Sequence, residues 1–214
     1  MRNILKRNVK SALERYNPTI IAVCGSVGKT TVRNLLAQSL SEYGAVGSNR
    51  KNYNSEWGII FSILQVEAPG KNPLEWLKII FKSFTFGNLE EEFPDIWVIE
   101  LGVDRPGDMD FFTQDFLEFD AVIYTFYGES PVHLENFDSV KDLVQEDLNA
   151  LTALKEDGFI IANSDDPMQA SMMTSPPCVS PCMEGLCTIL RAIPECLAIP
   201  AGKAITSIPS RVRA

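Results

Sequence analysis

The sequence predicts an α/β fold in which helices cover a mostly parallel sheet. Short apolar segments rich in β-branched residues alternate along the chain with longer segments whose apolar residues recur at helical spacing. The first apolar segment runs directly into a glycine-containing loop and then a helix. Helices that separate successive strands act as crossover connections, and such connections join parallel strands.

Composition limits the classes of function open to the 214-residue chain. Hydrophobic residues make up 45% of it and charged residues 22%, which is typical of a soluble globular protein. The net charge of −9 argues against nucleic-acid binding, because phosphate backbones select basic surfaces. No apolar run approaches the roughly 18 residues of a transmembrane helix. Five cysteines without zinc-site spacing favour a reducing, cytoplasmic environment.

Residues 1–18 are predicted to form an amphipathic helix that ends before Asn17-Pro18. Two interpretations fit this pattern: a helix that docks against the rest of the protein, and a helix that lies on a membrane surface. Docking is the simpler interpretation and the one we favour. The basic residues lie largely off the apolar face and are Arg2, Lys6, Arg7, Lys10 and Arg15.

Residues 20–31 predict a phosphate-binding loop between a strand and a helix, as in the three-layer domain of phosphate-loop NTPases. Two glycines let backbone N–H groups approach an anion, and the helix N-terminus adds partial positive charge. Lys29 supplies a full charge for phosphates, and the Thr30 hydroxyl is suited to Mg²⁺. The common motif has four residues between its glycines, whereas this loop has two. The loop is Gly25-Ser26-Val27-Gly28-Lys29-Thr30, and the apolar face of the following helix is Val32, Leu35, Leu36 and Leu40.

Further strands and helices follow the phosphate loop. Strands are expected at residues 45–46, 95–99, 120–125 and 158–162, and helices from near Ser55, over 73–84 and over 139–156. In the second of these helices, Trp76, Leu77, Ile80 and Phe81 lie on one side.

Two polar residues beyond the loop are candidate metal ligands. Glu100 ends an apolar strand, and the carboxyl ends of parallel strands open onto one crevice, so its carboxylate is placed to complete a Mg²⁺ site. The only histidine, His133, lies in the loop after the next strand and is predicted to bind metal or phosphate. Asn52 and Asn54 lie in a polar loop, where they either bind substrate or cap the next helix.

Five motifs, in order, resemble the central ATP-binding domain of the Mur ligase family, which builds the peptide of bacterial cell-wall precursors. The likeness spans residues 20–167 and is strongest, through ELGVDRPGD and HLENF, to members that add D-alanyl-D-alanine to a UDP-muramoyl tripeptide. The motifs are GSVGKTT, KNYNSEWG, VIELGVDRPGD, VHLENFDS and DGFIIANSDDP.

The resemblance implies an ATP-dependent amide ligase that phosphorylates a substrate carboxylate to an acyl phosphate, which an amine then attacks. Its substrates would be a UDP-muramoyl peptide and an amino acid or dipeptide. Lys29, Glu100 and His133 would be catalytic, with Thr30, Glu100 and His133 holding Mg²⁺. Asn52 and Asn54 would line the substrate loop, and Asn163 and Asp166 would lie near the adenine. The phosphates would contact Gly25, Ser26, Val27, Gly28, Lys29, Thr30 and Thr31.

The chain departs from the family pattern at several positions. Many members carry a carbamylated, metal-bridging lysine fourteen residues after the histidine, and here that position is Asp147, whose side chain is shorter. Cys24 replaces a usual threonine and Ile60 a usual proline. Two alternatives therefore stay open: a nucleotide-binding module without catalysis, and a folate-polyglutamating ligase of the same family.

The expected organisation is a helix at 1–18, a partial ATP-binding domain at 19–168, incomplete at its C-terminus, and an irregular tail at 169–214. The tail has prolines that break every candidate helix and four of the five cysteines. We interpret it as the product of a reading-frame or assembly break; a genuine cysteine-rich extension that binds a partner is the alternative. The expected domains that grip UDP and deliver the amine are absent from the 214 residues. The sequence leaves the oligomeric state open.

Overall fold

The computed structural model describes residues 1–50, 53–86, 93–128, 134–162, 166 and 169. It divides the chain into two units, Met1–Asn163 and Ser164–Ala214. The sheet belongs to the first unit. Apart from Gln169, the predicted tail at 169–214 lies outside the described residues.

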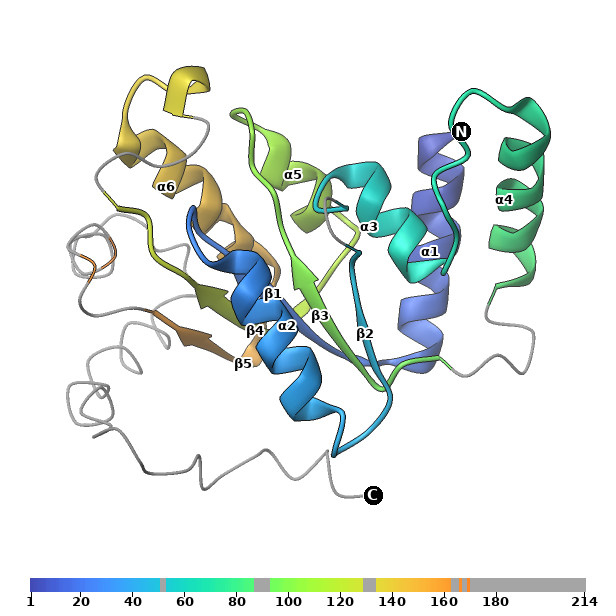
Figure 1. Cartoon of the computed structure of the whole chain (residues 1–214), viewed down its shortest axis with the longest axis horizontal. Helices are drawn as coiled ribbons and strands as arrows, with labels where there is room; N and C mark the ends of the chain where they lie inside the picture. Colours follow the sequence, from blue (N-terminus) through green and yellow to red (C-terminus); the bar gives the residue numbers. More distant parts are fainter. Residues whose placement is uncertain (51–52, 87–92, 129–133, 163–165, 167–168, 170–214) are drawn as a thin grey trace. The chain divides into compact units, whose positions relative to one another are not determined.

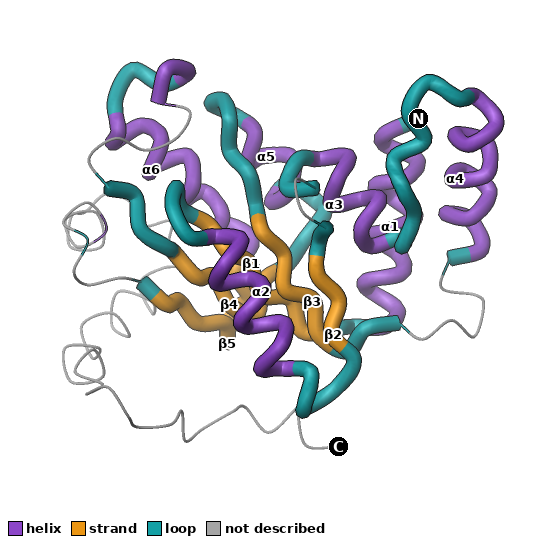
Figure 2. Tube along the Cα trace, viewed as in Figure 1, coloured by secondary structure: helices purple, strands orange, loops and turns teal. Residues whose placement is uncertain are grey.

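Five strands form the sheet in the order β2-β3-β1-β4-β5, and each strand is parallel to its neighbours (Figures 1 and 2). The prediction of a mostly parallel α/β sheet is therefore confirmed. Val23 pairs with Glu100 and Cys24 with Tyr124, so three strands end at one edge. The strands are β1 (Thr19–Cys24), β2 (Val46–Ser48), β3 (Ile96–Glu100), β4 (Phe119–Tyr124) and β5 (Leu154–Ile161).

Helix α2 (Lys29–Leu40) packs on one face of the sheet, against β1, β2 and β3 (Figure 1). Val23, Ile96 and Val98 form a buried cluster there with Val32 and Leu36 of the helix. The prediction that Leu35 belongs to the apolar face is wrong, because its side chain is 58% exposed. The alternate strand residues, among them Ile20, Trp97 and Ile99, are buried on the opposite face.

Helix α1 (Arg2–Tyr16) docks against two other helices, α3 (Glu56–Ile63) and α4 (Pro73–Thr85). Its apolar residues Leu5, Val9, Ala12 and Leu13 are buried, which confirms docking and the predicted end before Asn17. Helix α4 confirms the prediction over 73–84, but its packing face differs. Ile79 and Ser83 are buried, whereas Leu77 and Phe81 of the predicted face are exposed.

The segment 139–156 is not one helix. Helix α6 (Val140–Leu148) ends early, a 3₁₀ turn covers Asn149–Ala153, and β5 already begins at Leu154. Leu151 and Leu154 continue the helical spacing of apolar residues, but Leu154 pairs with Phe119 in the sheet. A short helix, α5 (Asp108–Thr113), was not predicted, and a 3₁₀ turn covers Leu134–Asn136. Among the described residues, no helix has the length and apolar character needed to cross a bilayer.

Candidate functional site

The loop between β1 and α2 has the backbone that its glycines predict. Gly25 has a φ of 112° and Gly28 a φ of 90°, values that side-chain-bearing residues rarely adopt. A Cβ at Gly25 would also collide with the Thr125 hydroxyl, whereas nothing lies within 4 Å of a Cβ at Gly28. Gly28 caps the N-terminus of α2, and Val27 is 53% exposed. The loop therefore presents an open surface at a helix N-terminus, which is where an anion binds.

The segment after β4 holds this loop in place. The Val27 N–H donates to the Phe126 carbonyl at 2.8 Å, and the Thr125 N–H donates to the Cys24 carbonyl at 2.9 Å. The Thr125 hydroxyl donates to the same Cys24 oxygen at 3.0 Å. These contacts connect residues about a hundred positions apart, which is why the sequence alone did not single out Thr125 and Phe126.

The ammonium group of Lys29 lies against its own loop. It donates to the Gly25 carbonyl and, at 3.3 Å, to the Ser26 carbonyl. The positive charge is thus held at the loop, beside the N-terminus of α2. Both features favour a bound phosphate. Of the other predicted loop contacts, Ser26 is half-buried and Thr31 is exposed.

Thr30 and Glu100, predicted as ligands of one metal ion, lie together. The Thr30 hydroxyl is 2.9 and 3.1 Å from the two carboxylate oxygens of Glu100. The Asn49 side chain fixes the backbone of Glu100. Its amide nitrogen donates to the Glu100 carbonyl at 2.9 Å, and its amide oxygen accepts from the Glu100 N–H at 2.8 Å. A hydroxyl and a carboxylate are hard oxygen donors, so this pair fits Mg²⁺.

Arg33 is a further residue of the site, and it was predicted only as part of a helix. Its guanidinium lies 3.1 Å from Glu100, and the two side chains are 5% and 8% exposed. In the sequence, an arginine one helical turn after the phosphate loop is expected to face solvent, so Arg33 was not predicted as a site residue. Its partner lies 67 positions further along the chain, so only the folded structure identifies the pair.

Asp147 is hydrogen-bonded to the backbone of the phosphate loop. Its carboxylate accepts hydrogen bonds from the Gly25 N–H at 3.0 Å and from the Tyr127 hydroxyl at 2.7 Å. Burial raises the pKa of Asp147 to about 6, although the Tyr127 hydrogen bond and the nearby Lys29 charge favour the ionised form. Burial likewise raises the pKa of the Cys24 thiol. A thiol held protonated in this way is a poor nucleophile, so Cys24 fills space in the core.

The remaining predicted residues are only partly described. Asn52, His133 and Asn163 lie outside the described residues. Asn54 lies beside the segment after β3, where the Gly102 N–H donates to the Asn54 carbonyl at 2.9 Å. Asp166 belongs to the second unit, where it accepts a hydrogen bond from Gln169 at 3.3 Å. Within the described ranges, no three His, Cys, Asp or Glu side chains gather as a metal cluster.

A hollow of about 560 Å³ lies at the other end of the sheet, lined by the starts of β1, β4 and β5. The lining includes Pro18 and Ile20 at the start of β1, Glu118 just before β4, and Leu154 at the start of β5. Because the phosphate loop follows the carboxyl end of β1, this hollow is not part of the site.

Comparisons with known proteins match this architecture. The profile of the Mur ligase middle domain matches residues 23–179. A UDP-N-acetylmuramoyl-tripeptide--D-alanyl-D-alanine ligase of Bacillus subtilis is 25% identical over 164 residues, which are 77% of this chain and 30% of the relative. The enzyme of the same name in Haemophilus influenzae is 28% identical over 156 residues, 71% of this chain and 28% of the relative.

Solved structures show the same fold. MurF from Acinetobacter baumannii has a TM-score of 0.60 and 20% identity, over 80% of this chain and 32% of that one. The MurF ligase of Thermotoga maritima in complex with ADP has a TM-score of 0.58 and 21% identity, over 79% of this chain and 34% of that one. The 214 residues span about 30% of the length of the Bacillus relative. Since the family profile covers most of the chain, this protein belongs to the Mur ligase family, to whose middle domain residues 23–179 correspond.

Proposed function

We propose that this chain binds ATP and Mg²⁺ at the β1–α2 loop, as the nucleotide-binding part of an amide ligase of peptidoglycan precursor synthesis. The contact between Thr30 and Glu100, beside the phosphate loop, carries the proposal. It brings together two oxygen donors from separate elements at the N-terminus of α2, where a nucleotide's phosphates and their metal ion are expected.

The loop residues have distinct roles in this proposal. Gly25 and Gly28 give the backbone its turn, and the N–H groups at the start of α2 bind phosphate oxygens. Lys29 adds a positive charge, and moves from the Gly25 carbonyl to the phosphates. Mg²⁺, held by Thr30, Glu100 and His133, would neutralise phosphate charge during transfer. Arg33 and Asn49 fix the position of Glu100.

The reaction we propose has the chemistry of the family. The terminal phosphate of ATP passes to a carboxylate of a UDP-muramoyl peptide, and the resulting acyl phosphate is attacked by the amine of D-alanyl-D-alanine. The attack forms an amide bond and releases phosphate. The protein's contribution is positioning and charge stabilisation. The two named relatives act, by their names, on a muramoyl tripeptide and D-alanyl-D-alanine. We place the reaction in the cytoplasm, where ATP is available.

Titration of the chain with a fluorescent ATP analogue, with and without Mg²⁺, tests the nucleotide site. Lys29→Ala is expected to weaken binding roughly 10- to 100-fold, as loss of a charge-assisted contact does. Lys71→Ala removes a lysine from the exposed segment before α4 and serves as the matched control. A folded native chain that does not bind ATP, or equal binding by the two variants, would contradict the proposal.

Ligation is tested separately. Phosphate release that requires both a UDP-muramoyl peptide and D-alanyl-D-alanine would support the complete reaction. Nucleotide binding without such release would indicate that the chain acts only as a nucleotide-binding module under these conditions. Asp147 gives this second outcome a structural basis. It stands where many family members carry a metal-bridging lysine, and its carboxylate is instead buried and hydrogen-bonded to Gly25 and Tyr127.

A further inference from the structure

The outer face of α4 is an exposed apolar surface. Four large side chains lie three or four residues apart and so share one side of the helix. We call this set the α4 stripe. It consists of Leu74, Leu77, Phe81 and Phe84, which are 67%, 63%, 71% and 54% exposed.

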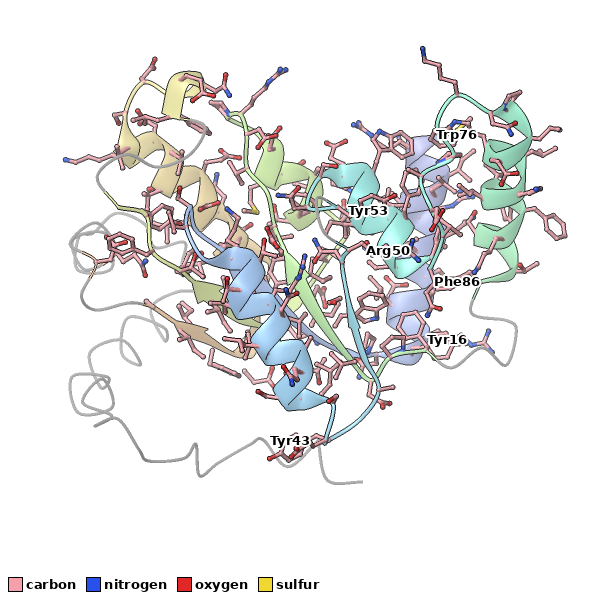
Figure 3. All side chains as sticks on the ribbon, in the orientation of Figure 1. Tyr16, Tyr43, Arg50, Tyr53, Trp76 and Phe86 are labelled. Carbon is pink, nitrogen blue, oxygen red and sulfur yellow. The ribbon has the colours of Figure 1, made fainter. Side chains whose placement is uncertain are left out.

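Contacts on the opposite side fix the direction in which the stripe faces. Ile79 and Ser83 are buried, and Ser83 accepts a hydrogen bond from Asn8 of α1 at 3.0 Å. The Trp76 ring, labelled in Figure 3, packs against Trp57 of α3 with the ring centroids 5.3 Å apart. Because the inner face of α4 is held by α1 and α3, the helix cannot turn its stripe into the first unit.

The N-terminus of α4 is also well defined. The Asn72 side chain accepts a hydrogen bond from the Leu74 N–H at 3.0 Å, and Pro73 occupies the first helical turn. The stripe is therefore presented by a formed helix. Contiguous apolar surface of this kind on a soluble domain marks a site of interaction.

Lysines lie on one side of the stripe and before its helix. Lys78 and Lys82 lie along one side of it and Lys71 precedes the helix, while the one acidic residue of α4, Glu75, pairs with Lys78 at 2.6 Å. Helix α1, which packs against α4, adds the exposed Arg7. Residues 71–86 hold three lysines and one glutamate, in a chain whose net charge is −9. Basic side chains therefore outnumber acidic ones beside the stripe.

We propose that the α4 stripe and its lysines bind the surface of a membrane that contains anionic lipids. An apolar face that enters the headgroup region, flanked by lysines that contact lipid phosphates, is the arrangement of helices that lie flat on bilayers. The apolar face of α1, the segment whose sequence first suggested a membrane contact, is buried inside the domain. The membrane contact therefore belongs to α4.

The charges favour a membrane over a second copy of the chain. A symmetric pair of α4 stripes would bring the lysines of both copies together, and like charges oppose such an interface. Anionic lipid headgroups instead complement these lysines.

Co-flotation of the chain with vesicles tests the proposal. We expect binding to vesicles of phosphatidylcholine with phosphatidylglycerol, much weaker binding to phosphatidylcholine alone, and weakening by salt. Phe81→Gln should reduce partitioning roughly tenfold, because it removes one buried aromatic ring. Lys78→Gln with Lys82→Gln should reduce it by about fivefold for each lysine. Leu35→Gln is the matched control, because Leu35 is an apolar residue of α2 that is 58% exposed, and this variant should bind as the native chain does.

Three results would overturn the proposal, provided that circular dichroism shows each variant folded. The first is a native chain that does not float with anionic vesicles. The second is flotation that Phe81→Gln and Leu35→Gln reduce equally. The third is self-association, seen by analytical ultracentrifugation and abolished by Phe81→Gln, without vesicle binding.

Discussion

The phosphate loop and helix α4 show opposite exceptions to the usual burial of side chains: charged groups are buried beside the loop, and large apolar groups are exposed on α4. Beside the loop, Arg33, Glu100 and Asp147 are charged or ionisable and nearly fully buried, each with a partner. On α4, large apolar residues such as Phe81 are exposed. Polar groups are normally outside and large apolar groups inside. Each departure coincides with a region for which we propose a function: nucleotide binding beside the loop and membrane-surface binding at α4.

The two regions should also respond differently to substitution. Buried polar contacts fail when one partner is lost, because the other then remains buried and unsatisfied. Exposed apolar side chains contribute little to folding. Substitutions near the loop should therefore change stability, whereas those on the stripe should change binding and leave stability intact.

The largest effect is expected for Arg33→Met. It leaves the Glu100 carboxylate buried without its guanidinium partner and should lower the unfolding free energy by roughly 3–5 kcal/mol in urea denaturation. The double variant Arg33→Met with Glu100→Gln should be destabilised by clearly less than the sum of the two single variants. Additive effects would show that the two side chains are not coupled.

Asp147→Asn should change how stability depends on pH. The folded pKa of Asp147, about 6, lies above its ordinary value of 3.8. Between these pH values the folded chain holds a proton that the unfolded chain has released, so this group's contribution to stability falls as pH rises through that window. Asparagine does not titrate. From pH 4.5 to pH 8, the native chain should therefore lose about 2 kcal/mol of stability relative to the variant. If the difference in unfolding free energy between the native chain and Asp147→Asn stayed constant from about pH 4.5 to about pH 8, or changed in the native chain's favour, the raised pKa would be contradicted.

Asn72→Ala tests whether α4 depends on its N-cap. Loss of the cap bond to the Leu74 N–H should cost about 1 kcal/mol. Ser55→Ala is the matched control, because Ser55 caps α3 without a side-chain hydrogen bond. Thermal denaturation of both variants gives the comparison, and equal losses would show that the Asn72 bond contributes nothing.

The smallest change in stability is expected for Phe81→Gln. Its side chain is 71% exposed, so unfolding free energy should stay within about 0.5 kcal/mol of the native value in urea denaturation. A loss above about 2 kcal/mol would mean that Phe81 is packed in solution and that the contrast between the two regions is wrong.

Much of the fold could be predicted from the sequence, because its signals are local. The run 20–31 carries its strand, glycine loop and helix start within twelve residues. The boundary between α6 and β5 could not be predicted, since Leu154 fits a helical pattern until its pairing with Phe119 is known. Helix α5 has only six residues and no full apolar period.

The candidate site divides in the same way. Lys29, Thr30 and Glu100 follow from a loop motif and from the rule that parallel strands end at one edge. Arg33 and Tyr127 do not, because their partners Glu100 and Asp147 are distant in sequence and approach only in the folded chain. The exposed face of α4 was also missed, since apolar residues on a helix are normally assigned to its packing side.

The central claim, a Mg²⁺-dependent nucleotide site at Thr30 and Glu100, is tested most directly by ATP affinity with and without Mg²⁺ in the native chain and in Thr30→Val. Thr113→Val in α5 is the matched control, because the Thr113 hydroxyl bonds only the Met109 carbonyl among the hydrogen bonds described. We predict that Mg²⁺ increases the ATP affinity of the native chain and of Thr113→Val. In Thr30→Val the increase in affinity caused by Mg²⁺ should be roughly tenfold smaller. A Thr30→Val variant with the native response to Mg²⁺ would contradict the claim.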